Sequence, residues 1–305
     1  PAIEAFPETM KKVLFSAMKK LFHENQINTF MAENAHKDTF SYVEAIVDYF
    51  DVSIGLKTNE LMHIPSYGRT VIIANHPLGA LDAMALLHLL KDVRKDIKIV
   101  ANSFLAQFDN LKDIIIPVDN INGKMSKETV TNIYESLEAE QAVIIFPSGE
   151  VSRARPNGVK DTPWKSGFLK IATKMQAPIL PIYIKAKNSK NFYLLSMINR
   201  SLATATLPHE MFKAKGKEID IKIGKPIPFD AYNVSNVSRK ERVKLLRKHL
   251  YRVSKNHKPV FATYNEISVA EGRSELKSEL KNGILLGQTT DGKSIIMYES
   301  ERENC

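Results

Sequence analysis

An α/β layered fold is predicted by two observations. Short apolar runs recur between residues 70 and 225, separated by segments with helical periodicity. Two of these runs stop at turns rich in Pro or Gly that carry ionisable side chains. A chain of 305 residues can hold one large domain or a domain with appendages. We therefore expect a mixed or mostly parallel sheet flanked by helices, with amphipathic helices at the N-terminus.

The net charge of the chain limits the classes of partner that we expect. The chain has 43 Lys and Arg against 34 Asp and Glu, a formal net charge of +9, which favours nucleic acid, anionic lipid or an acidic carrier protein. The sequence shows neither a spacing of zinc ligands nor an aromatic-rich nucleic-acid motif. We expect a membrane surface of anionic lipid or an acidic carrier protein as partner, no nucleic acid, no metal and no cofactor.

Compartment signals are few. The one cysteine, Cys305, is the last residue and forms no internal disulfide. No window approaches the roughly 20 apolar residues that cross a bilayer, and the N-terminus lacks a signal-peptide pattern. These observations predict a cytoplasmic protein that is peripheral on the inner face of the cell membrane.

Residues 1–54 are expected to form an N-terminal amphipathic helical region. Residues 7–33 place Val13 and Ala17 at helical spacing beside lysines, and residues 40–50 carry a second apolar stripe. An apolar face flanked by lysines is typical of a helix on a membrane surface. A helix docked on the core has the same pattern, and both interpretations stay open.

The first motif with chemistry follows an apolar run over residues 70–74. Asn75 and His76 end that run, Gly79 permits an unusual turn, and Asp82 falls in the first turn of the helix expected next. An imidazole that a carboxylate orients is a general-base arrangement. A turn histidine beside an aspartate that only caps the helix is the alternative.

A second motif also consists of an apolar run that ends in a polar turn. Residues 141–146 form another apolar run, which ends in a turn that holds Ser148, Gly149, Glu150 and Arg153. The carboxyl ends of neighbouring parallel strands lie at one edge of a sheet. We therefore expect the two turns to share one site.

A charged loop rich in Pro and Gly follows and ends near Lys165. Arg153 and Lys165 can gather an anionic group, such as a phosphate of phosphopantetheine or coenzyme A. A loop whose charges are simply solvated is the alternative.

The remaining elements follow from periodicity. Helices are expected over 83–91, 126–140, 164–175 and 238–254, a partly helical apolar segment over 191–212, and strands over 97–101, 114–119, 178–184 and 218–223. The segment 191–212 is expected to cover the sheet or to line an apolar groove. The strongly basic helix 238–254 presents a solvated face or a contact for a membrane or carrier protein.

Three ordered motifs together resemble a known family. Asn75-His76-Pro77 with Asp82, then Phe146 to Glu150, then the strand at 178–182 occur in the order found in PlsC-type glycerolipid (lysophospholipid) acyltransferases. The resemblance covers about residues 55–230 and implies a glycerol-3-phosphate acyltransferase-like fold, with the acyltransferase domain at 55–258. It is closest to the bacterial lyso-ornithine (aminolipid) O-acyltransferase or hemolysin-like branch.

The resemblance implies a reaction. A fatty acyl group moves from an acyl thioester, of acyl carrier protein or of coenzyme A, to the hydroxyl of a lyso-aminolipid such as lyso-ornithine lipid, without an acyl-enzyme. His76 takes the acceptor proton, Asp82 orients the imidazole, and backbone N–H groups at Gly79, at Gly149 and adjacent to them stabilise the oxyanion. The other substrate-binding candidates are Asn75, Ser148, Glu150, Arg153 and Lys165.

Two departures from the family pattern concern the motifs themselves. Five residues, 77–81, separate His76 from Asp82, where the family usually has four. Ser148 stands where the family usually has Glu, and Glu150 comes two residues later. Both changes indicate an acceptor other than lysophosphatidic acid.

A third departure is at the end of the 114–119 strand, where the family uses a basic residue for the acceptor head group. This strand ends in Asp119-Asn120, and the nearest basic residue is Lys124. The head-group contact is therefore unassigned.

Residues 259–305 lie beyond the family pattern. Two apolar runs around Asp291-Gly292 predict a pair of strands. Bifunctional bacterial aminolipid synthases join this acyltransferase type to a C-terminal GNAT-like N-acyltransferase. We expect 259–305 to be a C-terminal extension that begins such a domain.

Two other functions remain open: a 1-acylglycerol-3-phosphate (lysophosphatidic acid) acyltransferase, and a non-catalytic peripheral membrane-binding protein. A serine hydrolase that uses Ser148 is disfavoured, because Pro-Ser-Gly-Glu lacks the Gly-x-Ser-x-Gly turn of that class.

Overall fold

The computed structural model describes residues 7–264, apart from 104, 119–124 and 157, together with 283–288 and 294–298. Asp119-Asn120, Lys124, the Asp291-Gly292 turn and Cys305 lie outside the described residues.

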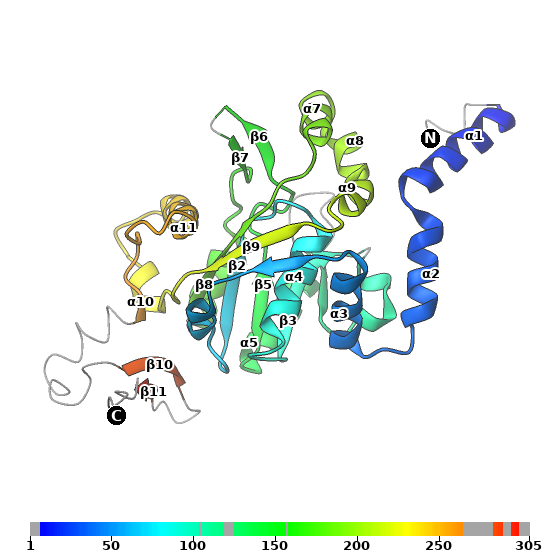
Figure 1. Cartoon of the computed structure of the whole chain (residues 1–305). Coiled ribbons are helices and arrows are strands. Elements are labelled where there is room, and N and C mark those ends of the chain that lie inside the picture. Colours follow the sequence, from blue (N-terminus) through cyan, green and yellow to red (C-terminus); the bar gives the residue numbers. More distant parts are fainter. Residues whose placement is uncertain are drawn as a thin grey trace, which may run out of the picture.

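One seven-stranded sheet runs through the centre of the structure (Figure 1). Its order is β1-β9-β8-β2-β5-β3-β4; β8 and β9 pair antiparallel, and every other neighbouring pair is parallel. This confirms the predicted mixed, mostly parallel sheet. The strands are β1 (Ser53–Gly55), β2 (Thr70–Ala74), β3 (Ile97–Asn102), β4 (Ile115–Val118), β5 (Ala142–Ile145), β8 (Ile179–Lys185) and β9 (Glu218–Ile223).

Helices cover both faces of the sheet, which is why the central strands are apolar at successive positions. In β2, Ile72 and Ala74 pack into one core and Val71 and Ile73 into the other, and all four are fully buried. The first core includes α3 (Thr39–Tyr49) and α4 (Ala80–Leu90). The second includes α5 (Lys127–Glu138), α6 (Gly167–Met175), α10 (Phe229–Tyr232) and α11 (Arg239–Val253).

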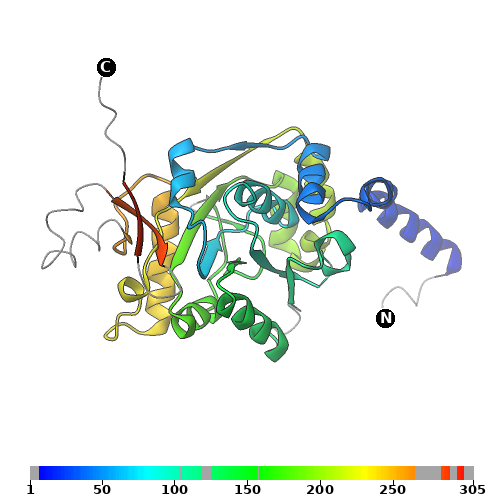
Figure 2. The same cartoon turned by 90° about the horizontal axis from the view of Figure 1, so that it is seen from below.

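The predicted N-terminal helical stretch is two helices, α1 (Glu8–Leu21) and α2 (Glu24–Asn34). They separate at His23, whose φ of 55° interrupts the helical backbone. The His23 ring stacks on Phe212 with centroids 3.9 Å apart, and its Nε2 lies 3.0 Å from Nδ1 of His209. These contacts fasten the start of α2 to α9 (Leu207–Lys213), while α1 extends away from the sheet (Figures 1 and 2).

The segment expected to be partly helical over 191–212 forms three short helices, α7 (Lys190–Ile198), α8 (Arg200–Ala205) and α9. Their breaks follow from local caps. The Ser189 side chain accepts the N–H of Phe192, and the Asn199 side chain accepts that of Leu202.

The charged loop after Arg153 contains a small hairpin that the sequence did not indicate, formed by β6 (Arg153–Arg155) and β7 (Gly158–Lys160). The two strands expected near the C-terminus are present as the antiparallel pair β10 (Gly283–Gln288) and β11 (Ser294–Tyr298). Short 3₁₀ turns complete the structure at η1 (Thr58–His63), η2 (Leu105–Gln107) and η3 (Asp109–Leu111). Within the described residues, none of the helices combines the length and apolar character needed to span a bilayer.

Candidate active site

His76 and Asp82 meet at the carboxyl end of β2. Nδ1 of His76 lies 3.0 Å from Oδ2 of Asp82, although the ring N–H is not aligned well enough with that oxygen for a hydrogen bond. The His76 side chain is 18% exposed, whereas Asp82 is fully buried. A buried carboxylate thus stands behind one nitrogen of an imidazole whose ring reaches a pocket, and such contacts tighten when substrate binds.

Asp82 is held by the backbone of the same turn. Its Oδ2 accepts the N–H groups of Leu78 at 2.8 Å and Gly79 at 3.0 Å, and the Asp82 N–H donates back to the Gly79 carbonyl. Burial raises the pKa of the Asp82 carboxyl, and His76 and the two N–H groups oppose that rise. The aspartate therefore caps the helix and faces the histidine at once, so the two interpretations of Asp82 are not exclusive.

Gly79 accommodates the longer spacing between His76 and Asp82. Its φ of 94° and ψ of −133° suit glycine, and it caps α4, which begins at Ala80 rather than at the predicted residue 83. The turn accommodates the extra residue before α4 begins, and the Asp82 carboxylate still reaches the His76 imidazole.

The second motif lies beside the first because β5 pairs parallel with β2. Phe146, the residue after β5, stacks on the His76 ring with centroids 4.0 Å apart and planes inclined by 21°. This contact fixes the orientation of the imidazole plane. It confirms that the two turns lie together at one edge of the sheet.

Ser148, Glu150 and Arg153 form a connected group behind the Phe146 turn. The Ser148 hydroxyl is buried and donates to the Glu150 carbonyl. Glu150 Oε2 lies 3.3 Å from Nη2 of Arg153, and the same Nη2 donates to the Thr204 hydroxyl. Arg153 is 4% exposed, and its Nη1 is buried without a hydrogen-bond partner. Arg153 therefore braces this wall of the site from behind.

Lys165 lies against the second turn. Its backbone N–H donates to the Pro147 carbonyl, and its Nζ lies 2.8 Å from the position that a Cβ on Gly149 would take. Gly149 has a φ of +67°. The glycine therefore leaves the space in which the ammonium group lies.

The predicted oxyanion donors at Gly79 and Gly149 need correction. The N–H of Gly79 is bonded to Asp82, and that of Gly149 donates to the Phe146 carbonyl at 3.0 Å. Both groups are used to shape the turns. Gly79 and Gly149 line the site, but their N–H groups are not free to bind an oxyanion.

Asn75 lies behind the site. Its side chain is buried, donates to the Ile184 carbonyl at 2.8 Å and accepts the Ile184 N–H at 2.7 Å. The amide therefore continues the pairing of β2 with β8 where the β2 backbone turns away. The geometry gives Asn75 a positioning role instead of the expected contact with substrate.

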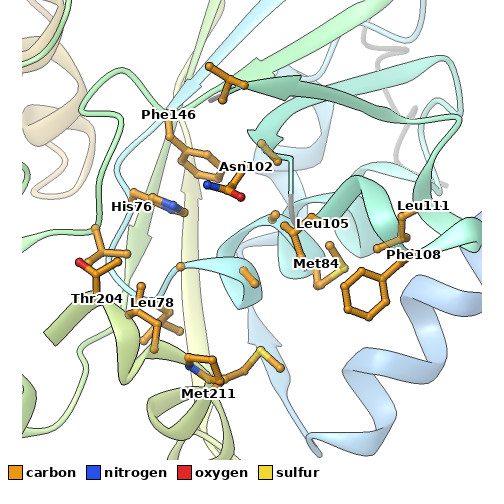
Figure 3. Close-up of a pocket in the computed structure, with 18 of the residues that line it drawn as sticks. His76, Leu78, Met84, Asn102, Leu105, Phe108, Leu111, Phe146, Thr204 and Met211 are labelled. Carbon is orange, nitrogen blue, oxygen red and sulfur yellow. The ribbon is translucent and has the colours of Figure 1, made fainter. Parts of the chain in front are cut away.

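One pocket of 1240 Å³ is bordered by part of this group (Figure 3). Its wall includes His76, Gly79, Phe146, Ser148, Gly149, Glu150 and Lys165, whereas Asn75, Asp82 and Arg153 lie outside it. Its wall combines side chains from both cores, such as Met84 and Leu111 from one and Val100 and Phe168 from the other. The pocket therefore crosses the edge of the sheet, with the His76 ring in its wall. Its volume exceeds the roughly 300–1,000 Å³ of ordinary small-molecule sites, and its largely apolar wall suits a long aliphatic group.

Comparison with known families decides the class. The family model described as "Acyltransferase" matches residues 7–258. The chain belongs to this acyltransferase family. The match includes the N-terminal helices together with the whole sheet.

Named relatives lie in the same class. The acyltransferase is 28% identical over 231 residues to a lyso-glycine lipid O-acyltransferase of Bacteroides thetaiotaomicron, covering 73% of this chain and 84% of that protein. A lyso-glycine lipid O-acyltransferase of Phocaeicola vulgatus is 27% identical over 229 residues, covering 73% and 81%. The crystal structure of the 1-acyl-sn-glycerophosphate acyltransferase PlsC of Thermotoga maritima is 14% identical, with 80% and 97% coverage and a TM-score of 0.43.

One residue central to the acyltransferase site was not a sequence candidate. Asp161 is 1% exposed, and its Oδ1 accepts the backbone N–H of His76 and the Ser152 hydroxyl, while Oδ2 accepts the Trp164 indole N–H. Arg247 of α11 donates to the Asp161 carbonyl. Nothing in the sequence indicated that this aspartate is buried, because it lies in a charged loop. Only the fold shows that the loop packs against the backbone of His76.

Proposed function

We propose that the acyltransferase moves a fatty acyl group from an acyl thioester to the hydroxyl of a lyso-aminolipid. The observation that carries the proposal is that His76, backed by the buried Asp82 carboxylate, lies in the wall of a largely apolar pocket of 1240 Å³. Membership of the acyltransferase family supports the class of reaction, and two relatives named for lyso-glycine lipid support the class of acceptor.

His76 acts as the general base. The acceptor hydroxyl gives its proton to Nε2 as its oxygen attacks the thioester carbonyl, and Asp82 stabilises the imidazolium that forms. When the tetrahedral intermediate collapses, the C–S bond breaks and the proton passes to the departing thiolate. Neither step needs an acyl-enzyme, in keeping with a Ser148 hydroxyl that is buried against the Glu150 carbonyl.

The negative charge of the intermediate develops near the N-terminus of α4. Gly79 and Ala80, where this helix begins, both belong to the pocket wall. The positive end of the helix dipole therefore faces the reacting carbonyl, and it favours an oxyanion there. This contribution takes over the role that was expected of the Gly79 and Gly149 N–H groups.

Lys165 recognises the head group of the acceptor. An amino acid joined to a fatty chain through its α-amino nitrogen keeps a carboxylate, which pairs with one ammonium group. Among the described residues of the pocket wall, Lys165 is the single Lys or Arg. Arg153 is buried behind the wall and is engaged by Glu150 and Thr204.

The named relatives and the acids of the pocket wall rank the acceptors. Both relatives are named for lyso-glycine lipid, so lysophosphatidic acid ranks below an amino acid head group. Lyso-ornithine lipid carries an additional ammonium group that requires an acidic partner, whereas the two acids of the described pocket wall, Glu24 and Glu150, are already paired with Lys19 and Arg153. We therefore place lyso-glycine lipid first and lyso-ornithine lipid second.

Radiolabelled acyl transfer tests the proposal. Purified protein is given acyl carrier protein or coenzyme A thioesters together with lyso-glycine lipid, lyso-ornithine lipid or lysophosphatidic acid, and the products are separated by thin-layer chromatography. We expect the highest kcat/KM with lyso-glycine lipid, and a loss on the order of 10³-fold in His76→Ala.

His36→Ala is the matched control, because His36 is exposed outside the pocket wall, and its activity should equal that of the wild type. Activity of His76→Ala within tenfold of the wild type would remove the general base from the mechanism. Preference for lysophosphatidic acid would overturn the assignment of the acceptor.

A further inference from the structure

An exposed apolar surface lies on α7 and α8. Eight large hydrophobic side chains stand out into solvent among the described residues, and four of them occur within nine positions of the chain. These four, which we call the α7–α8 patch, are Leu194 (60% exposed), Met197 (75%), Ile198 (85%) and Leu202 (57%). Clustered exposure of this kind marks an interaction site more often than scattered apolar residues do.

The patch is built on ordered helix. Leu194, Met197 and Ile198 follow the i, i+3, i+4 spacing of one helical face. Phe192 and Tyr193, which belong to the same helix, are buried. Helix α7 is thus apolar on its inner and its outer side, as expected for a helix that has apolar surroundings all round.

The chain segment that carries the patch is basic. Between residues 187 and 217 the chain has six Lys or Arg and one acid, Glu210. Glu210 is buried and is bonded to Ser189 and Lys213. The six basic residues are Lys187, Lys190, Arg200, Lys213, Lys215 and Lys217, and all are exposed. The surface charge of this segment is therefore positive throughout, which is complementary to an anionic surface.

The patch adjoins the reaction site. Thr204 at the end of α8 and Leu207 at the start of α9 belong to the pocket wall, and Figure 3 shows Thr204 near His76. Arg153 joins the two regions, since it donates to the Thr204 hydroxyl and lies over the Phe192 ring. Whatever covers the patch is next to the pocket.

We propose that the α7–α8 patch inserts into the surface of an anionic lipid bilayer. Apolar side chains enter the interface between head groups and acyl chains while Lys and Arg of the same segment pair with anionic lipid. A bilayer accounts for both the apolar patch and the basic character of its segment, and it holds the acyl-chain substrates beside the pocket. The site extends the proposed function, but its binding is measured without turnover, so that either can fail alone.

The first test places a fluorophore in the patch. Ile198→Trp is compared with Val234→Trp, a second exposed apolar position that lies outside the patch. The natural Trp164 is 7% exposed and bonded to Asp161, so it gives a constant background. The vesicles are phosphatidylcholine mixed with phosphatidylglycerol, which supplies the anionic surface. With them, the emission of the Ile198→Trp variant should shift to the blue and be quenched by brominated acyl chains. The Val234→Trp signal should not change.

The second test removes the apolar surface. Met197→Glu/Ile198→Glu should lower the affinity for these vesicles by at least about tenfold, since each buried apolar side chain contributes that much or more. Val234→Glu is the matched control and should bind as the wild type does. Binding should also weaken as salt rises. Acyl transfer to an acceptor presented in vesicles should fall in parallel, while transfer to a monomeric acceptor should not.

Three results would overturn the proposal. The first is equal quenching of the two introduced tryptophans, and the second is unchanged vesicle affinity in the double variant. The third is loss of self-association or of acyl carrier protein binding in the double variant with vesicle binding intact, which would assign the patch to a second copy of the chain or to the carrier.

Discussion

Replacement of Asp82 by Asn separates the two roles of this side chain. The amide oxygen can accept the same N–H groups, from Leu78 at 2.8 Å and Gly79 at 3.0 Å, that the carboxylate accepts. Helix capping is therefore retained. The negative charge 3.0 Å from Nδ1 of His76 is lost. The change isolates the electrostatic support of the imidazolium.

The size of the effect follows from that geometry. Opposite unit charges about 4 Å apart interact by about 4 kcal/mol at an effective dielectric constant near 20, and this corresponds to about 10³-fold in rate. The cost to folding is small by comparison. One carboxylate oxygen of Asp82 already lacks a hydrogen-bond partner, so the amide nitrogen there adds about 1–3 kcal/mol of desolvation.

The assay is acyl transfer measured as kcat and KM over a pH series, together with thermal unfolding. Asp38→Asn is the matched control, because Asp38 caps α3 by accepting the N–H groups of Phe40 and Ser41 and lies outside the pocket wall. We expect Asp82→Asn to lose about 10³-fold in kcat and Asp38→Asn to lose none. An Asp82→Asn enzyme within tenfold of the wild type would show that the carboxylate is only a helix cap.

Three further predictions use other parts of the structure. Burial lowers the pKa of His249 from 6.5 to about 4. Between these pH values the unfolded chain binds more protons than the folded one, so the free energy of unfolding should fall by up to about 3 kcal/mol as pH drops from 6.5 to 4. Calorimetry should show a weaker dependence of stability on pH in His249→Gln. Gly149→Ala should raise the KM for the acceptor about tenfold or more. The new Cβ would lie 2.8 Å from Nζ of Lys165, at a φ that disfavours alanine, and would displace the ammonium group. An unchanged KM would show that Lys165 does not bind the head group. Asp161→Asn should lower kcat more than it raises KM, because Asp161 holds the His76 backbone, and a change in KM alone would contradict that role.

The sheet was predictable because buried parallel strands are apolar on both faces. Each of the six strands expected within it begins within one residue of its predicted start, as β2 does at Thr70 and β9 at Glu218. The shared site followed from the same pattern. Strands that end in polar turns deliver those turns to one edge of the sheet, and the pairing of β2 with β5 brings His76 against Phe146.

The pocket and its supports were not predictable in this way. Burial of Arg153 and Asp161 depends on α8 and α11, which lie about 50 and 90 residues farther along the chain. A charge in a Pro-rich loop looks solvated until the tertiary partner is known. The helix breaks within 191–212 depend on single capping residues such as Asn199. The spacing of apolar residues, from which the helices were predicted, does not indicate where such caps lie.

The walls of the pocket come from opposite ends of the folded segment. Phe22 and Phe30 arrive early in the chain, while Met211 and Phe212 arrive some 180 residues later, and all four border the same space. During synthesis at about 5–20 residues per second, the early helices must wait on the order of ten seconds or more for the later ones. Through that interval their apolar sides face the ribosome's surroundings, where chaperones or a nearby bilayer are the available cover. A nascent chain that stopped before α9 would therefore have six of the seven strands of the sheet but would lack part of the pocket wall.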